Sequence, residues 1–122
     1  MTREQIRETI LGLKVGDHIQ INEWDKTFCV NGVSERFVLA HNGQEYTILG
    51  KKPVQYLRNG ITPGALVCAT DWWVFGYIDG YRFDNPKWVE GYMKSLESGE
   101  TEMSARNREE ILYIALRNDA SR

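Results

Sequence analysis

Aromatic residues gather in one stretch of this chain. The run Ala65–Phe83, ALVCATDWWVFGYIDGYRF, is followed closely by Trp88 and Tyr92. More than half of the chain's four Trp, six Tyr and four Phe residues lie between positions 72 and 92. Aromatic side chains that stack on bases contribute about 1–3 kcal/mol per base in nucleic-acid complexes. The run therefore suggests a platform for stacking a purine, and the alternative is that its rings fill the core of a small barrel.

The spacing of these rings limits where they can go. Trp72 and Trp73 are adjacent, so in a strand they face opposite ways. Trp73, Phe75 and Tyr77 share one face, and Trp72 lies on the other, which makes it a candidate for contact with a ligand or another subunit. Trp24 lies in a predicted turn and is a further candidate for an interface.

Basic and amide side chains come together near the C-terminus. Ser104-Ala105-Arg106-Asn107-Arg108 offers two fork-shaped guanidinium groups for phosphate and an amide for a base edge or ribose. The alternative is a solvated helix start, in which Glu109 and Glu110 pair with the arginines. Arg58, in an Arg-Asn-Gly turn, is another candidate phosphate ligand.

Asn85-Pro86 is typical of a helix start, with Asn as the cap and Pro at the first helical position. Capping is the simplest role for Asn85. The amides at such a helix start can also receive a phosphate, and here they follow the aromatic stretch.

Catalytic patterns are weaker. Asp71, Asp79 and Asp84 bracket the aromatic stretch, so a carboxylate pair is conceivable, but Asp at strand ends more simply forms turns. A hydrolase of a phosphorylated small molecule is the corresponding hypothesis. The sequence has neither a nucleophile elbow nor a phosphate-binding glycine loop. We therefore expect a binding protein rather than an enzyme.

Metal and disulfide chemistry are not favoured either. Cys29 and Cys68 are isolated, and His18 and His41 lie far apart without an HxH or CxxC pattern. We expect two buried free thiols, no metal site and no cofactor. Cys–His catalysis stays open, because its partners need not be neighbours in sequence.

Composition limits the class of protein. The chain has 122 residues, 42% of them hydrophobic, and a net charge of −2. This predicts one globular domain that does not bind nucleic acid non-specifically, because such binding usually needs a basic excess. No apolar run is long enough for a membrane span, and the N-terminus lacks an apolar signal core. We expect a cytoplasmic location.

The periodicity predicts an α+β fold with a single domain over 1–122. Thr2 and Gln5 suggest a capping box for a helix over 1–13, with one apolar stripe. Alternation and turn signals then predict an antiparallel β-meander over 15–84, either small and barrel-like or strongly coiled. The stripe of the N-terminal helix consists of Ile6, Ile10 and Leu13.

Turn signals and breaks refine this reading. Asn31-Gly32 suggests a bulge, Asn42-Gly43 and Asp79-Gly80 suggest hairpins, and Gly99 suits a helix end. The region 85–118 is predicted to be mainly helical. Its last segment, Ala105–Asn118, favours a helix slightly over a closing strand.

The order of elements resembles the first-described Thoeris anti-defence family, small phage proteins that sequester a cyclic ADP-ribose isomer. The suggestive pieces are Phe75 followed by Asn85 in DWWVFGYIDGYRFDN, with SARNR further on. The resemblance implies a ligand held between two protomers of a homo-oligomer in the host cytoplasm. It implies that Phe75 stacks, Asn85 makes a polar contact, and Arg58, Arg106 or Arg108 hold the phosphates. The alternative function is a small barrel-like inhibitor of a protein, or a nucleic-acid-binding module of a mobile element.

Overall fold

The protein is described by a computed structural model. Residues 1–23, 27–43, 45–51, 84–98 and 110–118 are described in full, and the backbone alone is described for 54–56, 65–67, 71–75 and 107–109. The elements, in chain order, are α1 (Arg3–Leu11), β1 (His18–Ile21), β2 (Phe28–Val33), β3 (Phe37–His41), β4 (Tyr46–Gly50), β5 (Val54–Tyr56), β6 (Ala65–Val67), β7 (Asp71–Phe75), α2 (Pro86–Ser98), β8 (Asn107–Glu110) and β9 (Ile114–Leu116).

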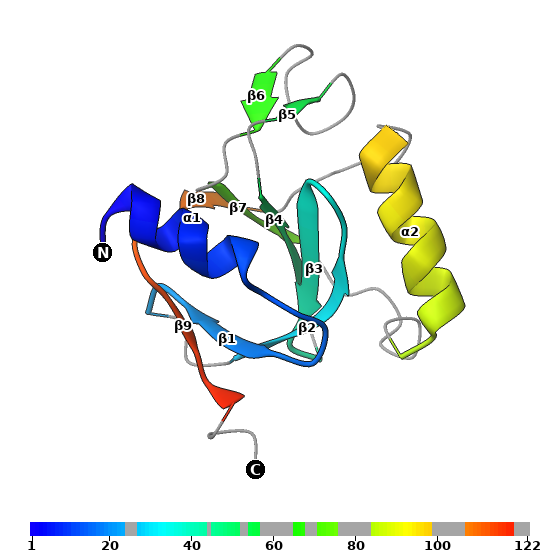
Figure 1. Cartoon of the computed structure of the whole chain (residues 1–122), viewed down its shortest axis with the longest axis horizontal. Helices are drawn as coiled ribbons and strands as arrows, with labels where there is room; N and C mark the ends of the chain where they lie inside the picture. The colour runs from blue at the N-terminus through cyan, green and yellow to red at the C-terminus, as the bar shows by residue number, and fades with distance from the viewer. Residues whose placement is uncertain are drawn as a thin grey trace.

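A seven-stranded antiparallel sheet forms the centre of the fold (Figure 1). Its strand order is β8-β7-β4-β3-β2-β1-β9, while β5 and β6 pair separately. The predicted α+β meander is therefore confirmed. Hydrogen bonds do not close the described sheet into a barrel, because its order begins at β8 and ends at β9. No helix in the described parts of the chain combines the length and apolar character needed to span a bilayer.

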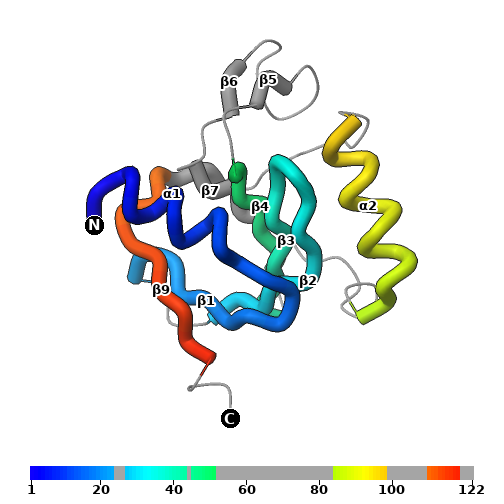
Figure 2. Tube along the Cα trace, in the orientation of Figure 1, coloured from blue at the N-terminus to red at the C-terminus, as the bar shows by residue number. Residues whose placement is uncertain are grey.

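Helix α1 covers one face of the sheet, as its apolar stripe predicts. The Thr2 hydroxyl accepts from the Gln5 amide and the Gln5 side chain accepts from the Thr2 amide, which completes the predicted capping box. Ile6, Ile10 and Leu13 are buried in a cluster with alternate residues of β1 to β4. Figure 2 shows α1 beside the C-terminal strand β9, far away in sequence.

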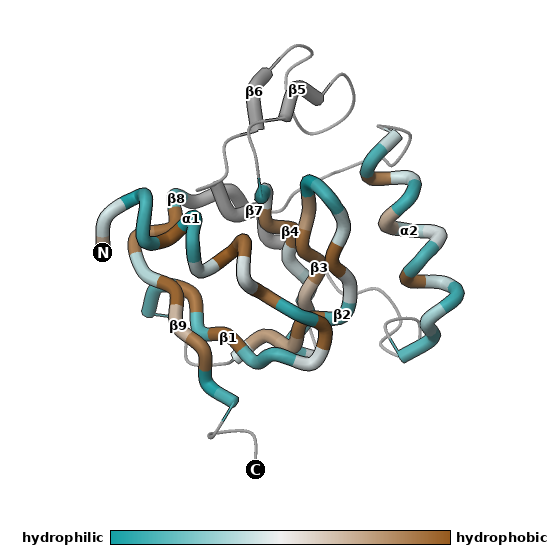
Figure 3. Tube along the Cα trace, viewed as in Figure 1, coloured by the Kyte–Doolittle hydropathy of each residue, from teal (hydrophilic) through white to brown (hydrophobic). Residues whose placement is uncertain are grey.

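Helix α2 covers the other face. Asn85 caps it, since its Oδ1 accepts from the amides of Lys87 and Trp88. The predicted buried stripe of α2 is confirmed at Val89, Met93 and Leu96. Strands β3 and β4 lie between the two helices and are mostly hydrophobic, whereas the trace of α2 alternates between hydrophilic and hydrophobic residues (Figure 3).

The predicted bulge in β2 positions α2. The register between β2 and β3 shifts between Val30 and Gly32, which turns Gly32 toward α2 and Val33 toward the core beneath α1. A Cβ on Gly32 would lie only 2.9 Å from Met93 Sδ and 2.9 Å from Val89 Cγ1. Only glycine lets helix and strand approach this closely.

A polar contact holds the far end of α2. The Glu97 carboxylate accepts from the Ser34 hydroxyl and from the Arg36 amide at 2.7 Å. These bonds tie the last turn of α2 to the connection between β2 and β3. The helix is therefore fixed to the sheet at its middle and near its C-terminal end.

The predicted helix over Ala105–Asn118 is wrong, and so is the mainly helical reading of 85–118 after α2. The described part of this segment forms β8 and β9, which pair with β7 and β1. Ile111 and Ile114 are both buried in the core. Their i, i+3 spacing fits one face of a helix, but it also fits a strand with a bend between the two residues. Pairing with strands distant in sequence overrides the local preference for helix.

Asn22 holds the corner between β8 and β9. Its Nδ2 donates to the Glu110 carbonyl at 3.1 Å, and its Oδ1 accepts from the amides of Leu112 at 2.8 Å and Tyr113 at 3.1 Å. Its own backbone amide donates to the Tyr113 carbonyl. The corner spans four residue steps, so the two edges of the sheet lie within about 14 Å. The sheet is therefore strongly curled.

Some predicted features fall outside the described residues. These are the Asp79-Gly80 hairpin, the turn at Trp24, the helix end at Gly99, and Cys68. The Asn42-Gly43 hairpin is confirmed between β3 and β4, with Gly43 at φ 89°.

Replacing Asn22 should loosen the corner. Asn22→Ala removes three side-chain hydrogen bonds and places alanine at φ 52°, so we expect unfolding free energy to fall by about 2–4 kcal/mol. Asn22→Gly loses the same bonds but tolerates the positive φ, so it should be more stable than Asn22→Ala by about 1 kcal/mol. Urea unfolding followed by circular dichroism measures both values. Two variants within about 0.5 kcal/mol of the wild type would contradict this role.

Two glycines give a matched test of how α2 docks. Gly32→Ala forces its methyl group against Met93 and Val89, and we expect a loss of about 1–3 kcal/mol. Gly91→Ala, on α2 with nothing within 4 Å of the new Cβ, should gain about 0.5–1 kcal/mol from helix propensity. Thermal unfolding of both variants gives the comparison. Equal effects would show that α2 does not press on β2 at Gly32.

Candidate functional site

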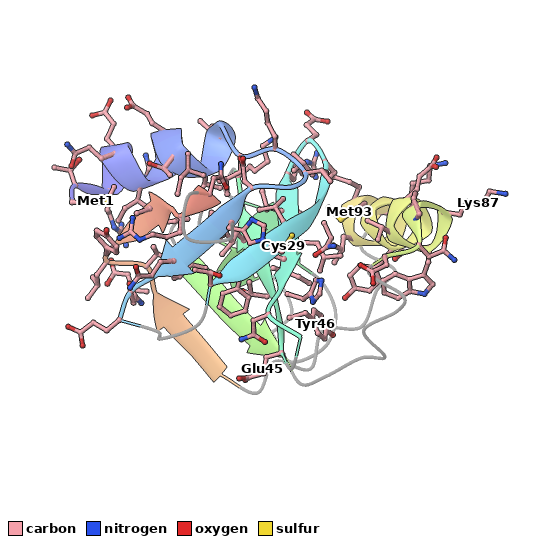
Figure 4. The ribbon with its side chains drawn as sticks, turned by 90° about the horizontal axis from the view of Figure 1, so that it is seen from below. Met1, Cys29, Glu45, Tyr46, Lys87 and Met93 are labelled. Carbon is pink, nitrogen blue, oxygen red and sulfur yellow. The ribbon has the colours of Figure 1, made fainter. Side chains whose placement is uncertain are left out.

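One row of residues crosses the sheet beneath α2. Cys29 of β2 pairs with His41 of β3, His41 pairs with Tyr46 of β4, and Tyr46 pairs with Phe75 of β7. Directly paired residues share a face of a sheet. Figure 4 places Cys29, Tyr46 and Met93 between the sheet and α2, with Lys87 on the outer side of the helix.

Three rings form an aromatic cluster at one end of this row: Tyr46, Trp88 and Tyr92. The rings of Trp88 and Tyr92 stack with centroids 5.1 Å apart and an interplanar angle of 11°. Tyr92 meets Tyr46 edge-on, at 6.5 Å and 81°. Tyr46 is buried, whereas Trp88 and Tyr92 are half-buried and offer part of their surface to solvent. The cluster therefore presents a partly open aromatic surface at the N-terminal half of α2.

Tyr46 is the anchored member of the cluster. Burial raises the pKa of its hydroxyl, and a hydrogen bond with Tyr92 acts in the opposite direction. Tyr46 therefore stays protonated at neutral pH and can act as a hydrogen-bond donor.

The sheet brings the aromatic strand beside the C-terminal segment that carries Arg108. In the register of β7 and β8, Trp73 lies opposite Arg108 and Val74 lies opposite Asn107. Trp72 lies opposite Glu109. Two segments more than thirty residues apart are thus adjacent strands. By register, Arg108 shares a face of the sheet with Trp73 and Phe75, whereas Asn107, opposite Val74, lies on the other face.

Asn85 joins this region through the helix rather than through the sheet. It caps the turn of α2 that carries Trp88, and Trp88 stacks on Tyr92. Tyr92 in turn contacts Tyr46, which is the backbone partner of Phe75 in the sheet. Asn85 is exposed. Helix α2 itself packs mainly on β2 and β3.

The other predicted candidates differ in whether the structure describes them. Arg58, Arg106, Trp24 and Tyr77 lie outside the described residues. Of the three aspartates, Asp79 also lies outside. Asp71 pairs with Glu110 at the opposite end of β7 from Phe75, whereas Asp84 lies beside Cys29 and His41. Asp71 and Asp84 therefore do not form a carboxylate pair.

Cys29, His41 and Asp84 form a polar group that the sequence did not reveal. Their separation along the chain hides it, and only the strand register brings the thiol opposite the imidazole. Burial, and secondly the Asp84 carboxylate, raise the pKa of the Cys29 thiol. Burial lowers the pKa of His41, and Asp84 partly opposes this. At neutral pH both Cys29 and His41 are therefore uncharged.

This polar group is not arranged as an activated nucleophile. His41 Nδ1 accepts a hydrogen bond from the Gly43 amide at 3.2 Å, so the neutral ring carries its proton on Nε2. The ring in this state has no acceptor nitrogen left to take a proton from the thiol. A thiol with a raised pKa is in turn a weak nucleophile. Within the described residues, no cluster of His, Cys, Asp and Glu could hold a metal ion.

The opposite flank of α2 carries a groove. It lies between α2 and β2 and has a volume of about 970 Å³. Three carboxylates and one ammonium line it: Asp84, Glu90, Glu97 and Lys94. The excess of negative charge disfavours phosphate there. Helix α2 thus separates an aromatic flank from an acidic one.

No protein-family model, curated protein or solved structure matches this chain. The assignment of function therefore rests on the residues and their geometry.

Removing the Asp84 charge should make Cys29 more reactive. Asp84→Asn lowers the pKa of the thiol, so more thiolate is present at pH 7.5 and alkylation by iodoacetamide should accelerate by a factor on the order of two. The same change should lower the pKa of His41, measured by NMR titration. The variants are compared in a Cys68→Ser background, with Glu4→Gln on α1 as the charge-matched control. Slower alkylation, or a raised His41 pKa, would contradict the arrangement.

Proposed function

We propose that this protein binds a cyclic ADP-ribose-type signalling nucleotide and sequesters it without cleaving it. The observation that carries the proposal is the pairing of β7 with β8 beside the aromatic cluster. It brings an aromatic strand next to the strand that carries Arg108, on the sheet whose neighbouring strand β4 holds the partner of the two half-buried rings. This combination supports recognition of a purine joined to phosphates, and it is consistent with the resemblance to Thoeris anti-defence proteins.

The purine would be held by stacking. Trp88 and Tyr92 already lie parallel on the helix, and Phe75 is the backbone partner of Tyr46 in the same cluster. A base contributes about 1–3 kcal/mol when stacked on an aromatic side chain. Asn85, at the exposed start of the same helix, has an amide suited to a polar contact with the nucleoside.

The phosphates would be held by arginine. Arg108 lies on β8, directly beside β7 and on the same face as Phe75, whereas Asn107 is on the other face. Arg106 and Arg58 are the further candidates. Bidentate arginine–phosphate contacts are among the stronger hydrogen-bonded pairs. The groove on the other flank of α2 has an excess of negative charge, which would repel an anionic ligand. The aromatic flank is therefore the better place for such a ligand.

Sequestration requires tight binding and no turnover. A nanomolar dissociation constant corresponds to about 12 kcal/mol, more than one stacked base supplies. A site shared between two protomers would add arginines from both chains, so we propose a homo-oligomer acting in the host cytoplasm. Such a protein would block Thoeris immunity by lowering the free concentration of the signal.

Ligand capture and release test the proposal. The protein is mixed with cyclic ADP-ribose isomers, binding is measured by calorimetry and thermal shift, and the ligand released on heating is identified by mass spectrometry. We expect one isomer to bind with a nanomolar dissociation constant, raise the melting temperature and be recovered intact. A chemically altered nucleotide would indicate an enzyme, and no binding by any isomer would contradict the proposal.

Variants locate the site. Trp88→Ala and Arg108→Gln should each weaken binding about 10- to 100-fold, through loss of stacking or of a phosphate contact. Leu112→Ala and Arg7→Gln are the matched controls, because Leu112 is exposed at the sheet corner and Arg7 is exposed on α1. Equal losses in a variant and its control would place the nucleotide elsewhere.

A protein-binding inhibitor is the second candidate, and β9 favours it. This strand ends the described sheet order. Leu116 within it is 49% exposed, and Leu112 just before it is 65% exposed. An extended partner segment can add to such an edge through backbone hydrogen bonds. A purified chain that binds no nucleotide but retains one host protein at unit stoichiometry would support this candidate.

A further inference from the structure

The groove on the acidic flank of α2 has the character of a second binding site. Val89 and Met93 of the helix, Val15 before β1 and Cys29 of β2 line it, so much of its surface is apolar. Its volume of about 970 Å³ is at the upper end of the range of small-molecule pockets. Its lining extends from Asp84 to Ser98, which lie at opposite ends of α2. At the rise of an α-helix, the distance along the axis from Asp84 to Glu97 is about 20 Å. The groove therefore suits an elongated ligand.

Two of the three carboxylates that line the groove have polar partners, and the third differs. Glu90 pairs with Lys94 at 3.2 Å, and Glu97 is occupied by Ser34 and Arg36. Asp84 is exposed at the start of α2, and among the described residues it has no hydrogen-bond or ion-pair partner. Within the part of the chain that the structure describes, Asp84 is thus a carboxylate without a counter-charge at one end of an apolar groove.

We propose that this groove binds an apolar small molecule that carries one positive charge, with the charge at Asp84 and the aliphatic body along Val89 and Met93. An anion would meet the net negative charge of the lining. A neutral molecule would leave Asp84 without a counter-charge. A linear alkylammonium group satisfies both the apolar surface and the carboxylate.

This site lies on the other flank of α2 from the proposed nucleotide site and takes a ligand of opposite charge. The two proposals therefore fail independently. Loss of nucleotide binding leaves the groove proposal intact, and an unoccupied groove leaves the nucleotide proposal intact.

Matched series of n-alkylamines and n-alkanoates, from four to ten carbons and below their micelle concentrations, test the proposal. Binding is measured by calorimetry and by protection of Cys29 from iodoacetamide in a Cys68→Ser background. We expect the amines to bind and to protect Cys29, with affinity rising about two- to fourfold for each added methylene until the groove is filled. Alkanoates of equal length should bind about tenfold more weakly or not at all.

A charge variant identifies the end of the groove that holds the cation. Asp84→Asn should weaken amine binding about two- to fivefold. It should also reduce the difference in affinity between an amine and the alkanoate of equal length. Glu4→Gln, which removes a carboxylate from α1, should change neither affinity. Protection is compared with and without ligand for each variant, because Asp84→Asn also changes the reactivity of Cys29. Melting temperatures confirm that each variant is folded.

The outcomes that overturn the proposal are distinct. Equal affinity for amines and alkanoates would mean non-specific hydrophobic association. Amine binding without protection of Cys29 would place the ligand outside the groove. An amine affinity that is unchanged in Asp84→Asn would remove the role of that carboxylate.

Discussion

The close approach of α2 to β2 at Gly32 determines how both faces of this helix are used. The bulge in β2 turns Gly32 toward the helix, and the absence of a Cβ lets Met93 and Val89 lie almost on the backbone. With its middle fixed there and its last turn tied through Glu97, α2 has little freedom to roll. The aromatic residues of α2 are then directed toward β4, and its acidic residues toward the groove.

The curl of the sheet is the second constraint, and it decides which segments become neighbours. Asn22 satisfies the backbone at the corner between β8 and β9, so consecutive stretches of chain can pair with opposite edges of the sheet. Ile111 and Ile114, on either side of that corner, fill the core beneath α1. As a consequence Asn107 and Arg108 lie on the strand beside β7. The proposed nucleotide site depends on this pairing more than on any single residue.

Local signals were sufficient for much of this fold. The capping box at Thr2, the cap at Asn85, the bulge at Asn31-Gly32 and the hairpin at Asn42-Gly43 each depend on residues close in sequence, and each is confirmed. The C-terminal strands could not be predicted in this way, because their backbone partners lie far away in the chain. The same reason hid the group of Cys29, His41 and Asp84, whose members meet only through strand register and helix placement.

The central claim is that an anionic nucleotide binds on the aromatic flank of α2 and not in the acidic groove. NMR chemical-shift mapping during titration with cyclic ADP-ribose isomers tests it most directly. We expect shifts in the Trp88 indole, in Tyr92 and in the amides of β7 and β8, while Val15 and Gly16 at the groove stay unchanged. Shifts confined to Val15, Gly16 and Cys29, or none at millimolar ligand, would contradict the claim.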